Sequence, residues 1–480
     1  MIRVLSLGIA LVALMLNMTL AIPVTQVQLL VDATVHHQTM EGFGATLTPF
    51  ELDGIFKAHD PSQPQRVSAT AEQRRDIASL LFEQLGLTRV RLFPEGFEPV
   101  NDNDEPGAFN PQGFDWSRVD ALTDFARLAQ PYGLQNGWAS FGMDTGARQA
   151  WLRTSADGCP LDPTKVDEAV EWLLAAALRF RDAGVELPYM TIINEPDLCP
   201  KIEIKEYLAI ARGLGARLQA EGLSTRLVVS DGWLPENALR YMRAALNDPQ
   251  IRPYVGALAY HAYDGYDNLQ VLEHSAAGLP PHGGTQARGQ IRELAAQYGL
   301  PVWMTEVCYC VSRQASAFEL LRGRLNHLHD ELTLADVSAF DAMNLFFIER
   351  PGIYDELVHV YFRADGALER YEISPYGYML GHYSRFVPTG SVRLQADSSD
   401  PRVRATAFAR PDGHVVVVVL NNNPVEVQLE MAFNGLSPQG FSALTSDASA
   451  YWQEGLEVSV HGQRANIIAP PLSVTTYVEQ

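Results

Sequence analysis

Between about residue 40 and residue 350, short apolar runs alternate with amphipathic helical patterns. This alternation of strand and helix is typical of a parallel sheet. Eight such units over roughly 310 residues predict a (β/α)8 TIM barrel, a fold of about 250 residues that grows by insertions. The alternative is an open doubly wound sheet, but no G-x-G-x-x-G motif follows the first strand to support its nucleotide-binding form. The expected strands are Met40–Thr46, Leu87–Phe93, Leu134–Ala139, Tyr189–Ile193, Leu227–Ser230, Val255–Tyr260, Val302–Thr305 and Ala339–Phe347.

After about residue 386 the alternation of strand and helix patterns ends. Strand-like runs then follow one another with turn-forming residues between them and no helical pattern. Such a series predicts an antiparallel β-sandwich. We therefore expect the barrel over residues 37–385 and the sandwich over residues 386–480, with segment 22–36 able to add one strand to the sandwich. The expected sandwich strands are Val392–Leu394, Ala405–Ala409, Val415–Leu420, Val425–Phe433 and Ser473–Val478, together with the early run Val27–Val31.

Residues 1–21 have the features of a secretory signal peptide. Arg3 gives a positive start, Val4–Leu16 is apolar but short for a membrane span, and small residues precede a cleavage site after Ala21. We expect a secreted, extracellular protein without integral membrane association, and an uncleaved membrane anchor is the alternative.

Charge and cysteine spacing narrow the range of partners. The chain has 36 Lys and Arg against 57 Asp and Glu, a net charge of −21 that repels nucleic acid and anionic membranes. The Cys-x-Cys pair lacks the usual zinc-ligand spacing, so no metal or cofactor is expected. Four cysteines in an oxidising compartment allow three disulfide pairings, and the spacing does not choose among Cys159, Cys199, Cys308 and Cys310.

Two glutamates end strands of the predicted barrel. The fourth strand runs into Asn194-Glu195 and the seventh ends at Glu306. Reacting groups in this fold lie at the carboxyl ends of the strands, so these carboxylates can face each other across the mouth. Two opposed carboxylates are what glycoside hydrolysis requires, and a separation of about 5 to 5.5 Å would indicate retention of configuration. Either glutamate alone would more often be a helix-terminal charge or a salt-bridge partner.

Five motifs are spread along the predicted barrel and its join to the sandwich: Glu41–Thr46, Arg89–Arg91, Ile193–Pro196, Trp303–Glu306 and Tyr376–Val387. Through these motifs, and over nearly the whole mature length, the chain resembles glycoside hydrolase family 30, a retaining family that includes glucosylceramidases, β-1,6-glucanases and xylanases.

The resemblance implies a role for each matching residue. Glu195 would be the acid/base and Glu306 the nucleophile, and Asn194 would bind the 2-hydroxyl of the sugar. Arg91 would hydrogen-bond Glu306 and keep it ionised through its positive charge. Structural ion pairing within the barrel is the alternative role for this arginine.

Aromatic residues at the strand ends are candidates for binding sugar rings. His261 and Tyr263 fit the family's His-x-Tyr after strand six, where the tyrosine hydroxyl can orient the nucleophile. Trp138, Trp233 and Tyr309 are candidate stacking platforms, because the flat C–H faces of sugars pack on aromatic rings. Core packing is the alternative role for each of them.

Two departures from the family pattern affect the predicted substrate. After strand three, Trp138 is followed by Ala139–Gly142, and the next tryptophan, Trp151, lies farther on. After strand eight, Glu349 stands where glucuronate-recognising members have an arginine. Arg350 could still bind a carboxylate, but the neighbouring negative charge argues against a strong uronate site.

These observations predict a retaining β-glycoside hydrolase that acts by double displacement on a plant or microbial β-linked glycan, as xylanases and β-1,6-glycanases do. Two alternatives stay open. One is a glucosylceramidase-like exo-β-glycosidase, and the other is a non-catalytic carbohydrate-binding protein on the same scaffold. Endo or exo action depends on loop conformation at the barrel mouth, and the oligomeric state is equally open at this stage.

Overall fold

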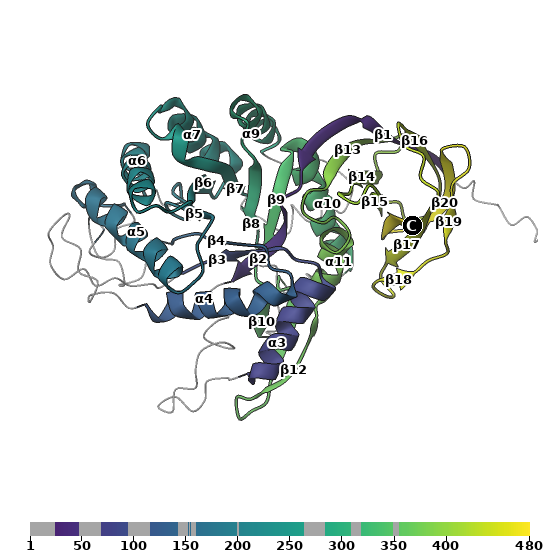
Figure 1. Cartoon of the computed structure of the whole chain (residues 1–480). Helices are drawn as coiled ribbons and strands as arrows, with labels where there is room; N and C mark the ends of the chain where they lie inside the picture. Colours follow the sequence, from purple (N-terminus) through teal and green to yellow (C-terminus); the bar gives the residue numbers. More distant parts are fainter. Residues whose placement is uncertain are drawn as a thin grey trace, which may run out of the picture.

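Eight parallel strands close into a barrel on one side of the molecule, and a ten-stranded sheet lies on the other (Figure 1). The computed structural model describes residues 25–47, 69–94, 116–142, 152, 154, 160–198, 201–263, 284–308, 318–348 and 355–480. The expected signal peptide lies outside these ranges, as do Trp151, Cys159, Cys199, Tyr309, Cys310, Glu349 and Arg350.

The closed barrel confirms the predicted fold class. Its strands follow one another in chain order, and the last pairs with the first through Gly42 and Ala339. They are β2 (Gly42–Leu47), β3 (Arg89–Leu92), β4 (Asn136–Ala139), β5 (Tyr189–Thr191), β6 (Arg226–Gly232), β7 (Val255–His261), β8 (Val302–Glu306) and β9 (Val337–Ala342).

The last expected strand, Ala339–Phe347, is wrong as a single element. It breaks after Ala342, where Asn344 adopts a left-handed φ of 62°. The chain then enters β10 (Phe346–Ile348), which pairs with β11 (Val358–Phe362) in a small sheet completed by β12 (Leu368–Ile373). A continuous apolar run concealed this break, because hydrophobicity alone does not report a change of strand direction.

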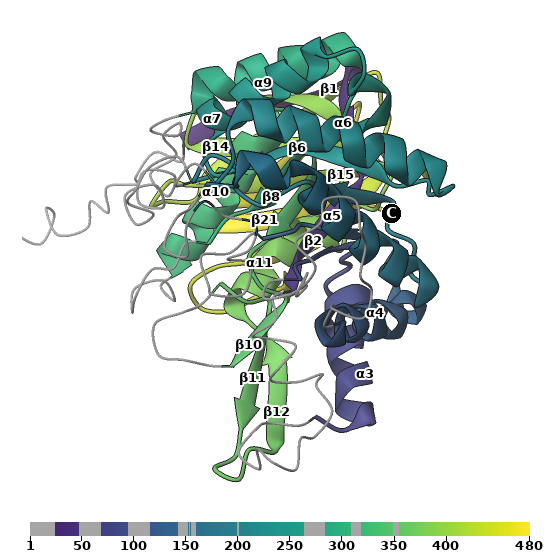
Figure 2. The same cartoon turned by 90° about the vertical axis from the view of Figure 1, so that its left-hand side faces the viewer.

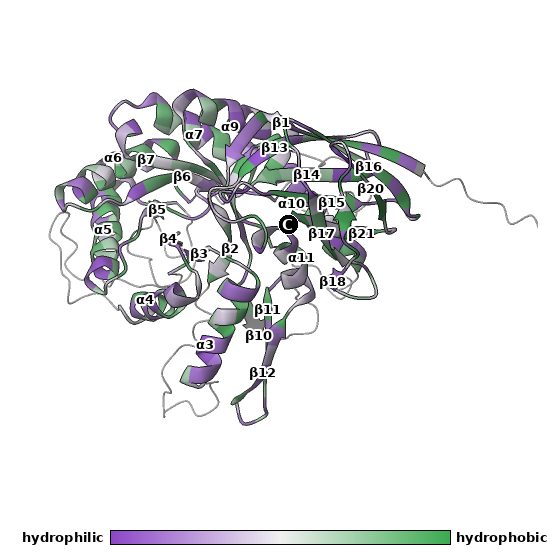
Figure 3. Ribbon diagram, turned by 45° about the vertical axis from the view of Figure 1, so that its right-hand side comes forward, coloured by the Kyte–Doolittle hydropathy of each residue, from purple (hydrophilic) through white to green (hydrophobic). Residues whose placement is uncertain are grey.

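Helices surround the barrel, and the small sheet projects beside α3 (Figures 1 and 2). Along these helices hydrophilic and hydrophobic residues alternate (Figure 3), as expected for one face on the strands and one in water. Among the described helices, none combines the length and the apolar character needed to cross a bilayer. The helices are α3 (Ala71–Ser79), α4 (Ser117–Ala129), α5 (Val166–Asp182), α6 (Ile204–Ala220), α7 (Pro235–Asn247), α9 (Thr285–Tyr298), α10 (Phe318–Leu334) and α11 (Pro375–Ser384), with shorter turns at Leu80–Gln84, Gln130–Tyr132, Pro163–Lys165 and Arg252–Tyr254.

A charged pair between two tryptophans fills part of the barrel interior. Arg89 donates from Nε and Nη2 to the two carboxylate oxygens of Asp341, each at 2.9 Å. The guanidinium carbon lies 4.3 Å from the Trp303 ring centroid and 5.8 Å from that of Trp138. Trp138 also donates its indole N–H to Asp341 and is 0% exposed. The prediction that Trp138 stacks on sugar is therefore wrong, since the barrel core covers both faces of the ring.

The second sheet includes strands from both ends of the chain. β1 (Thr25–Thr39), which contains the early run Val27–Val31, lies between β13 and β16, antiparallel to the first and parallel to the second. The remaining strands are β13 (Val392–Ser398), β14 (Val403–Ala409), β15 (Val415–Asn421), β16 (Val427–Asn434), β17 (Gly440–Ser446), β18 (Gln453–Glu454), β19 (Val458–Ser459), β20 (Arg464–Ala469) and β21 (Ser473–Glu479).

Strands β17 to β20 were not predicted, because their sequences are short or rich in polar and small residues. Strand β15 shows how the sheet joins the barrel. Alternate residues of its Val415–Asn421 run face opposite sides, and both sides are buried. Val415, Val417 and Val419 belong to the core within the sandwich, whereas Val416, Val418 and Leu420 belong to the core shared with the barrel.

His382 of α11 makes a polar contact across this shared core. Its Nδ1 lies 2.9 Å from Thr476 Oγ1 on β21, and its Nε2 lies 2.7 Å from Ser446 Oγ on β17. The ring is 0% exposed, and burial lowers the pKa of His382 to about 3. The folded protein therefore holds this histidine neutral.

A buried neutral histidine makes the fold sensitive to acid. The unfolded chain binds a proton at His382 below about pH 6.5, whereas the folded chain does so only near pH 3, so stability falls as the pH drops through this window. Between pH 7 and pH 5 this residue should cost about 2 kcal/mol. Because His382→Gln removes the titrating group, we expect urea titrations to show that this variant loses about 2 kcal/mol less stability than wild type between pH 7 and pH 5. The exposed control His461→Gln should lose as much stability as wild type. An equal loss in all three proteins would contradict this assignment.

Candidate active site

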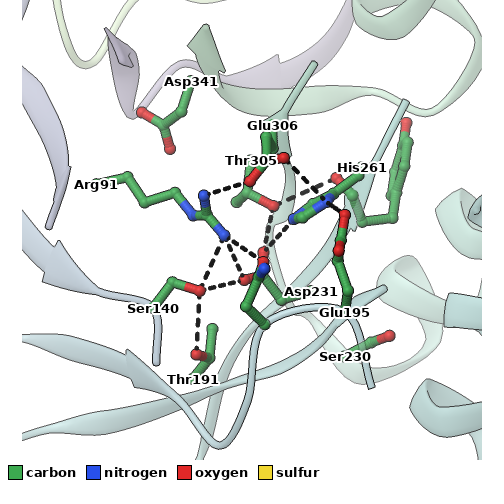
Figure 4. Close-up of polar contacts among 12 residues, drawn as sticks. Arg91, Ser140, Thr191, Glu195, Ser230, Asp231, His261, Thr305, Glu306 and Asp341 are labelled. Carbon is green, nitrogen blue, oxygen red and sulfur yellow. Dashed lines mark hydrogen bonds and ion pairs between the residues drawn. The ribbon is translucent and has the colours of Figure 1, made fainter. Parts of the chain in front are cut away.

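The two predicted glutamates meet at the carboxyl end of the barrel (Figure 4). Glu306 is the last residue of β8, and Glu195 follows β5. One carboxylate oxygen of Glu195 lies within 4.8 Å of one of Glu306. Each residue is 8% exposed, so both are enclosed by protein but still reach the mouth of the barrel.

The backbone turns sharply at the first of these glutamates. Glu195 has a φ of 51°, in the left-handed region that costs a non-glycine residue of order 1 kcal/mol or more. Its N–H donates to the carbonyl of Asp231 at 2.9 Å, and the N–H of Asn194 donates to the carbonyl of Phe141 at 2.6 Å. These bonds to neighbouring strand ends hold the strained turn and fix the direction of the Glu195 side chain.

Arg91, the third residue of β3, lies beneath the pair and is fully buried. Its Nη1 donates to Glu306 Oε2 at 2.6 Å. Its Nη2 faces Asn194 Oδ1 at 2.6 Å, Ser140 Oγ at 2.9 Å and Asp231 Oδ2 at 3.0 Å. Burial disfavours the charge, but Asp231 and Glu306 outweigh it and raise the pKa of Arg91. The arginine therefore stays positive and orients four neighbours.

Glu306 is surrounded by donors and positive charge. Tyr263 donates its hydroxyl to Oε1 at 2.9 Å, while Arg91 holds Oε2. Burial alone would raise the pKa of Glu306, but the charges of His261 and Arg91 and the Tyr263 hydrogen bond together lower it below its ordinary value, against a smaller opposing effect of Asp231. Glu306 is therefore an ionised carboxylate at neutral pH.

His261 bridges two acids. Its Nδ1 lies 3.0 Å from Glu195 Oε1, and its Nε2 lies 3.3 Å from Asp231 Oδ1. Burial would lower its pKa, but the charges of Glu306 and Asp231 raise the pKa of His261 to about 10. Glu195, His261 and Glu306 have the donor types and spacing of a metal site. In this structure hydrogen bonds and ion pairs join the three side chains, with His261 Nδ1 3.0 Å from Glu195 Oε1 and 3.9 Å from Glu306 Oε1.

Asp231 is a site residue that the sequence analysis missed. It lies near the end of β6, is 0% exposed, and accepts hydrogen bonds from Thr305 and Ser140 at 2.5 Å each, in addition to the contacts with Arg91 and His261. Burial would raise the pKa of Asp231, but Arg91 and His261 lower it overall. The rule that acids at strand ends mark the site could have found it. The predicted fifth strand ends at Ser230, whereas β6 extends to Gly232 and therefore includes Asp231.

The remaining candidates lie around this core in different ways. The Trp233 ring centroid is 6.4 Å from that of Tyr263, so this half-buried tryptophan lies beside the carboxylate pair. Cys308 donates its N–H to the Tyr263 hydroxyl at 3.0 Å and is disulfide-bonded. Its disulfide partner lies outside the described residues, as do Tyr309 and Arg350, so the pairing and the role of these two residues stay predictions.

Sequence comparison agrees with this geometry. Residues 390–477 match the family model of the glycosyl hydrolase family 30 beta sandwich domain. The chain is 27% identical over 303 residues to glucuronoxylanase XynC of Bacillus subtilis, which covers 62% of this chain and 62% of that protein. It is also 26% identical over 241 residues to the lysosomal acid glucosylceramidase of Mus musculus, covering 46% of this chain and 41% of that protein.

By its sequence, the chain resembles glycoside hydrolase family 30. The resemblance predicted from its motifs is thereby confirmed. The match spans 62% of the length of the Bacillus relative. Structural comparison extends the likeness in fold. The catalytic domain of the family 30 xylanase C from Talaromyces cellulolyticus superposes with a TM-score of 0.70 at 18% identity, covering 94% of this chain and 100% of that one.

The hydrogen bond from Tyr263 gives a test of this arrangement. Because it helps to lower the pKa of Glu306, Tyr263→Phe should raise that pKa and shift the acidic limb of the kcat/KM profile to higher pH. Loss of a hydrogen bond to a charged group should also lower kcat/KM at the optimum by about tenfold. Tyr477→Phe, at a buried position in the sandwich, is the matched control and should leave the profile unchanged. An unmoved acidic limb in Tyr263→Phe would show that the bond does not act on the group that titrates there.

Proposed function

We propose that this protein is a retaining β-glycoside hydrolase that acts by double displacement. The observation that carries the proposal is the pair Glu195 and Glu306, with carboxylate oxygens within 4.8 Å of each other. Inverting enzymes separate their carboxyl groups by about 6.5 to 9.5 Å to admit a water, whereas retaining enzymes keep them about 5 to 5.5 Å apart. The spacing here favours direct attack by one carboxylate.

The environments of the two acids support a different role for each. Glu306 is held ionised by Arg91, His261 and Tyr263, as a nucleophile must be. It attacks the anomeric carbon while Glu195 gives its proton to the glycosidic oxygen, and the carbon–oxygen electron pair leaves with that oxygen. A water then attacks the anomeric carbon of the glycosyl ester from the side that the leaving group has vacated, and the Glu195 carboxylate accepts its proton. The bond between that carbon and the Glu306 oxygen breaks, and its electron pair restores the Glu306 carboxylate.

Asn194 is suited to bind the sugar. Arg91 donates to its side-chain Oδ1, which fixes the orientation of the amide and leaves the NH2 group as the donor on the other side. A donor next to the acid/base can bind the 2-hydroxyl, a contact that strengthens as the ring flattens in the transition state. Trp233 and Tyr263 then provide an aromatic wall beside the same sugar.

We propose a β-linked glycan outside the cell as the substrate, of the kind that xylanases and β-1,6-glycanases cleave. The apolar run Val4–Leu16 before Ala21 supports export, and a disulfide at Cys308 suits an oxidising compartment. A glucosylceramidase-like exo-enzyme is the second candidate, favoured by the likeness to the mouse protein. Reducing-sugar release from xylan, β-1,6-glucan, β-1,6-galactan and aryl β-glycosides would identify the sugar, and the product lengths would separate endo from exo action.

Removal of the nucleophile should distinguish an enzyme from a binding protein. We expect Glu306→Ala to abolish hydrolysis of an aryl β-glycoside, because no group remains to form the glycosyl ester. External azide should restore part of the activity and yield a glycosyl azide of inverted configuration, since azide can enter the space left by the carboxylate. Glu221→Ala, at an exposed position after α6, serves as the control and should keep full activity without azide. Full activity in a folded Glu306→Ala protein would refute the mechanism, and an azide product of retained configuration would exchange the two roles.

The proton donor is tested by the leaving group. Glu195→Gln should lower kcat/KM by about 10² to 10⁴ for a substrate with a sugar leaving group, the usual contribution of general acid catalysis. A 2,4-dinitrophenyl glycoside should lose far less, because its leaving group departs without protonation. The basic limb of the pH profile should disappear at the same time. Equal losses for both substrates with the basic limb intact would show that another group donates the proton.

A further inference from the structure

Lys201 places an ammonium group next to the proposed proton donor. It lies in the connection between Glu195 and α6, is 7% exposed, and was not predicted as a site residue. Its Nζ donates to the Asn194 carbonyl at 3.2 Å and lies 3.9 Å from Glu195 Oε2. The Lys201 carbonyl accepts the Leu161 N–H at 2.8 Å, which anchors the backbone at this point. A strongly hydrated ammonium is rarely enclosed without a partner, so its position requires an explanation.

The two oxygens of Glu195 have different neighbours. Oε1 lies 3.0 Å from Nδ1 of His261, which is a protonated imidazole at neutral pH and therefore donates there. A proton on Oε1 would oppose that donor. This contact favours Oε2 as the oxygen that carries the transferable proton of Glu195, and Oε2 is the oxygen that lies 3.9 Å from Lys201 Nζ. The ammonium group thus stands beside the atom from which the proton leaves.

The charges around the site explain why a third cation is useful. In the resting state Arg91 and His261 face the carboxylates of Glu306 and Asp231, so these four charges balance. Formation of the glycosyl ester neutralises Glu306, and the lost proton leaves Glu195 negative. One unit of negative charge therefore moves from Glu306 to Glu195. His261 faces one oxygen of the new carboxylate, and Lys201 faces the other.

We propose that Lys201 is a positioning residue that stabilises the carboxylate of Glu195 as the leaving group departs. This inference rests on the proposed hydrolase function. The proton passes from Glu195 Oε2 to the glycosidic oxygen, the O–H electron pair stays on Oε2, and the ammonium group of Lys201 interacts more strongly with the resulting anion than with the neutral acid. The aid is greatest where proton transfer is most needed, namely for sugar and other weakly acidic leaving groups.

The test removes the charge and varies the leaving group. For the sugar identified in the reducing-sugar screen, kcat/KM is measured with phenyl and 2,4-dinitrophenyl β-glycosides in the full-length wild type and in Lys201→Met. We expect a loss of about tenfold for the phenyl substrate and little change for the dinitrophenyl substrate, a fraction of the whole general-acid effect. The basic limb of the phenyl profile should move to higher pH, because the adjacent cation has been removed.

Three further variants separate charge from structure. Lys205→Met is the matched control, since that side chain is 91% exposed, and it should behave as wild type. Lys201→Gln keeps an N–H donor for the Asn194 carbonyl but lacks the charge, so it should follow Lys201→Met. Lys201→Arg keeps the charge and should preserve the position of the basic limb. Thermal unfolding checks that each variant is folded. If Lys201→Met does not fold, the comparison of wild type with Lys201→Gln provides the test of charge.

The outcomes separate this inference from the function on which it rests. Equal losses for both substrates with an unmoved basic limb would mean that Lys201 only fixes the loop through the Asn194 carbonyl, and would overturn the proposal. A Lys201→Gln variant with the wild-type limb would overturn it too. If the wild type hydrolyses none of the glycans and glycosides of the screen while remaining folded, the proposed function fails and the inference falls with it.

Discussion

The buried guanidinium of Arg91 is the constraint on which the rest of the site depends. It contacts groups on or next to β4, β5, β6 and β8, so the ends of four strands are set by one side chain from β3. An unpaired charge at a fully buried position would cost several kcal/mol, and Glu306 and Asp231 remove that cost only in this geometry. The same contacts that make the arginine tolerable also hold Glu306 in place and keep it ionised.

Below Arg91, the barrel interior contains another buried arginine that is neutralised by a carboxylate. Arg89 and Asp341 form a second buried pair, enclosed by Trp138 and Trp303 rather than by branched aliphatic residues. Many TIM barrels fill this space with Val, Ile and Leu. Both side chains of this lower pair are 0% exposed, so the pair is shielded from water. The barrel interior thus contains two levels of buried ion pairs, Arg89 with Asp341 below and Arg91 with Glu306 above. In the upper level, Arg91 contacts Glu306, whereas His261 and Lys201 lie beside Glu195.

The sandwich supports this arrangement from the side. Strand β15 is buried on both faces, and His382 hydrogen-bonds to two of the sandwich strands across the shared core. The first barrel strand, β2, follows directly after β1. Between them, the Met40 N–H donates to the Ser391 carbonyl, and the Met40 carbonyl accepts the Gly390 N–H. The barrel therefore begins at a point fixed by the second domain, which limits the freedom of Gly42–Leu47 at the base of the site.

The sequence by itself determined the barrel, the second sheet and the carboxylate pair. Hydrophobic periodicity is a local property, and Asn194-Glu195 and Thr305-Glu306 each stand directly after an apolar strand, so a rule about strand ends was enough to find them. Only the tertiary structure decided which neighbours surround each side chain. Trp138 and Trp233 both stand at or just after the end of a predicted strand, yet Trp138 is buried in the core. Asp231 reaches the site through a left-handed turn, and Lys201 reaches it from a backbone position anchored by Leu161. Their contacts join residues that are distant in the chain, and the electrostatic effect of each depends on distances that no local pattern contains.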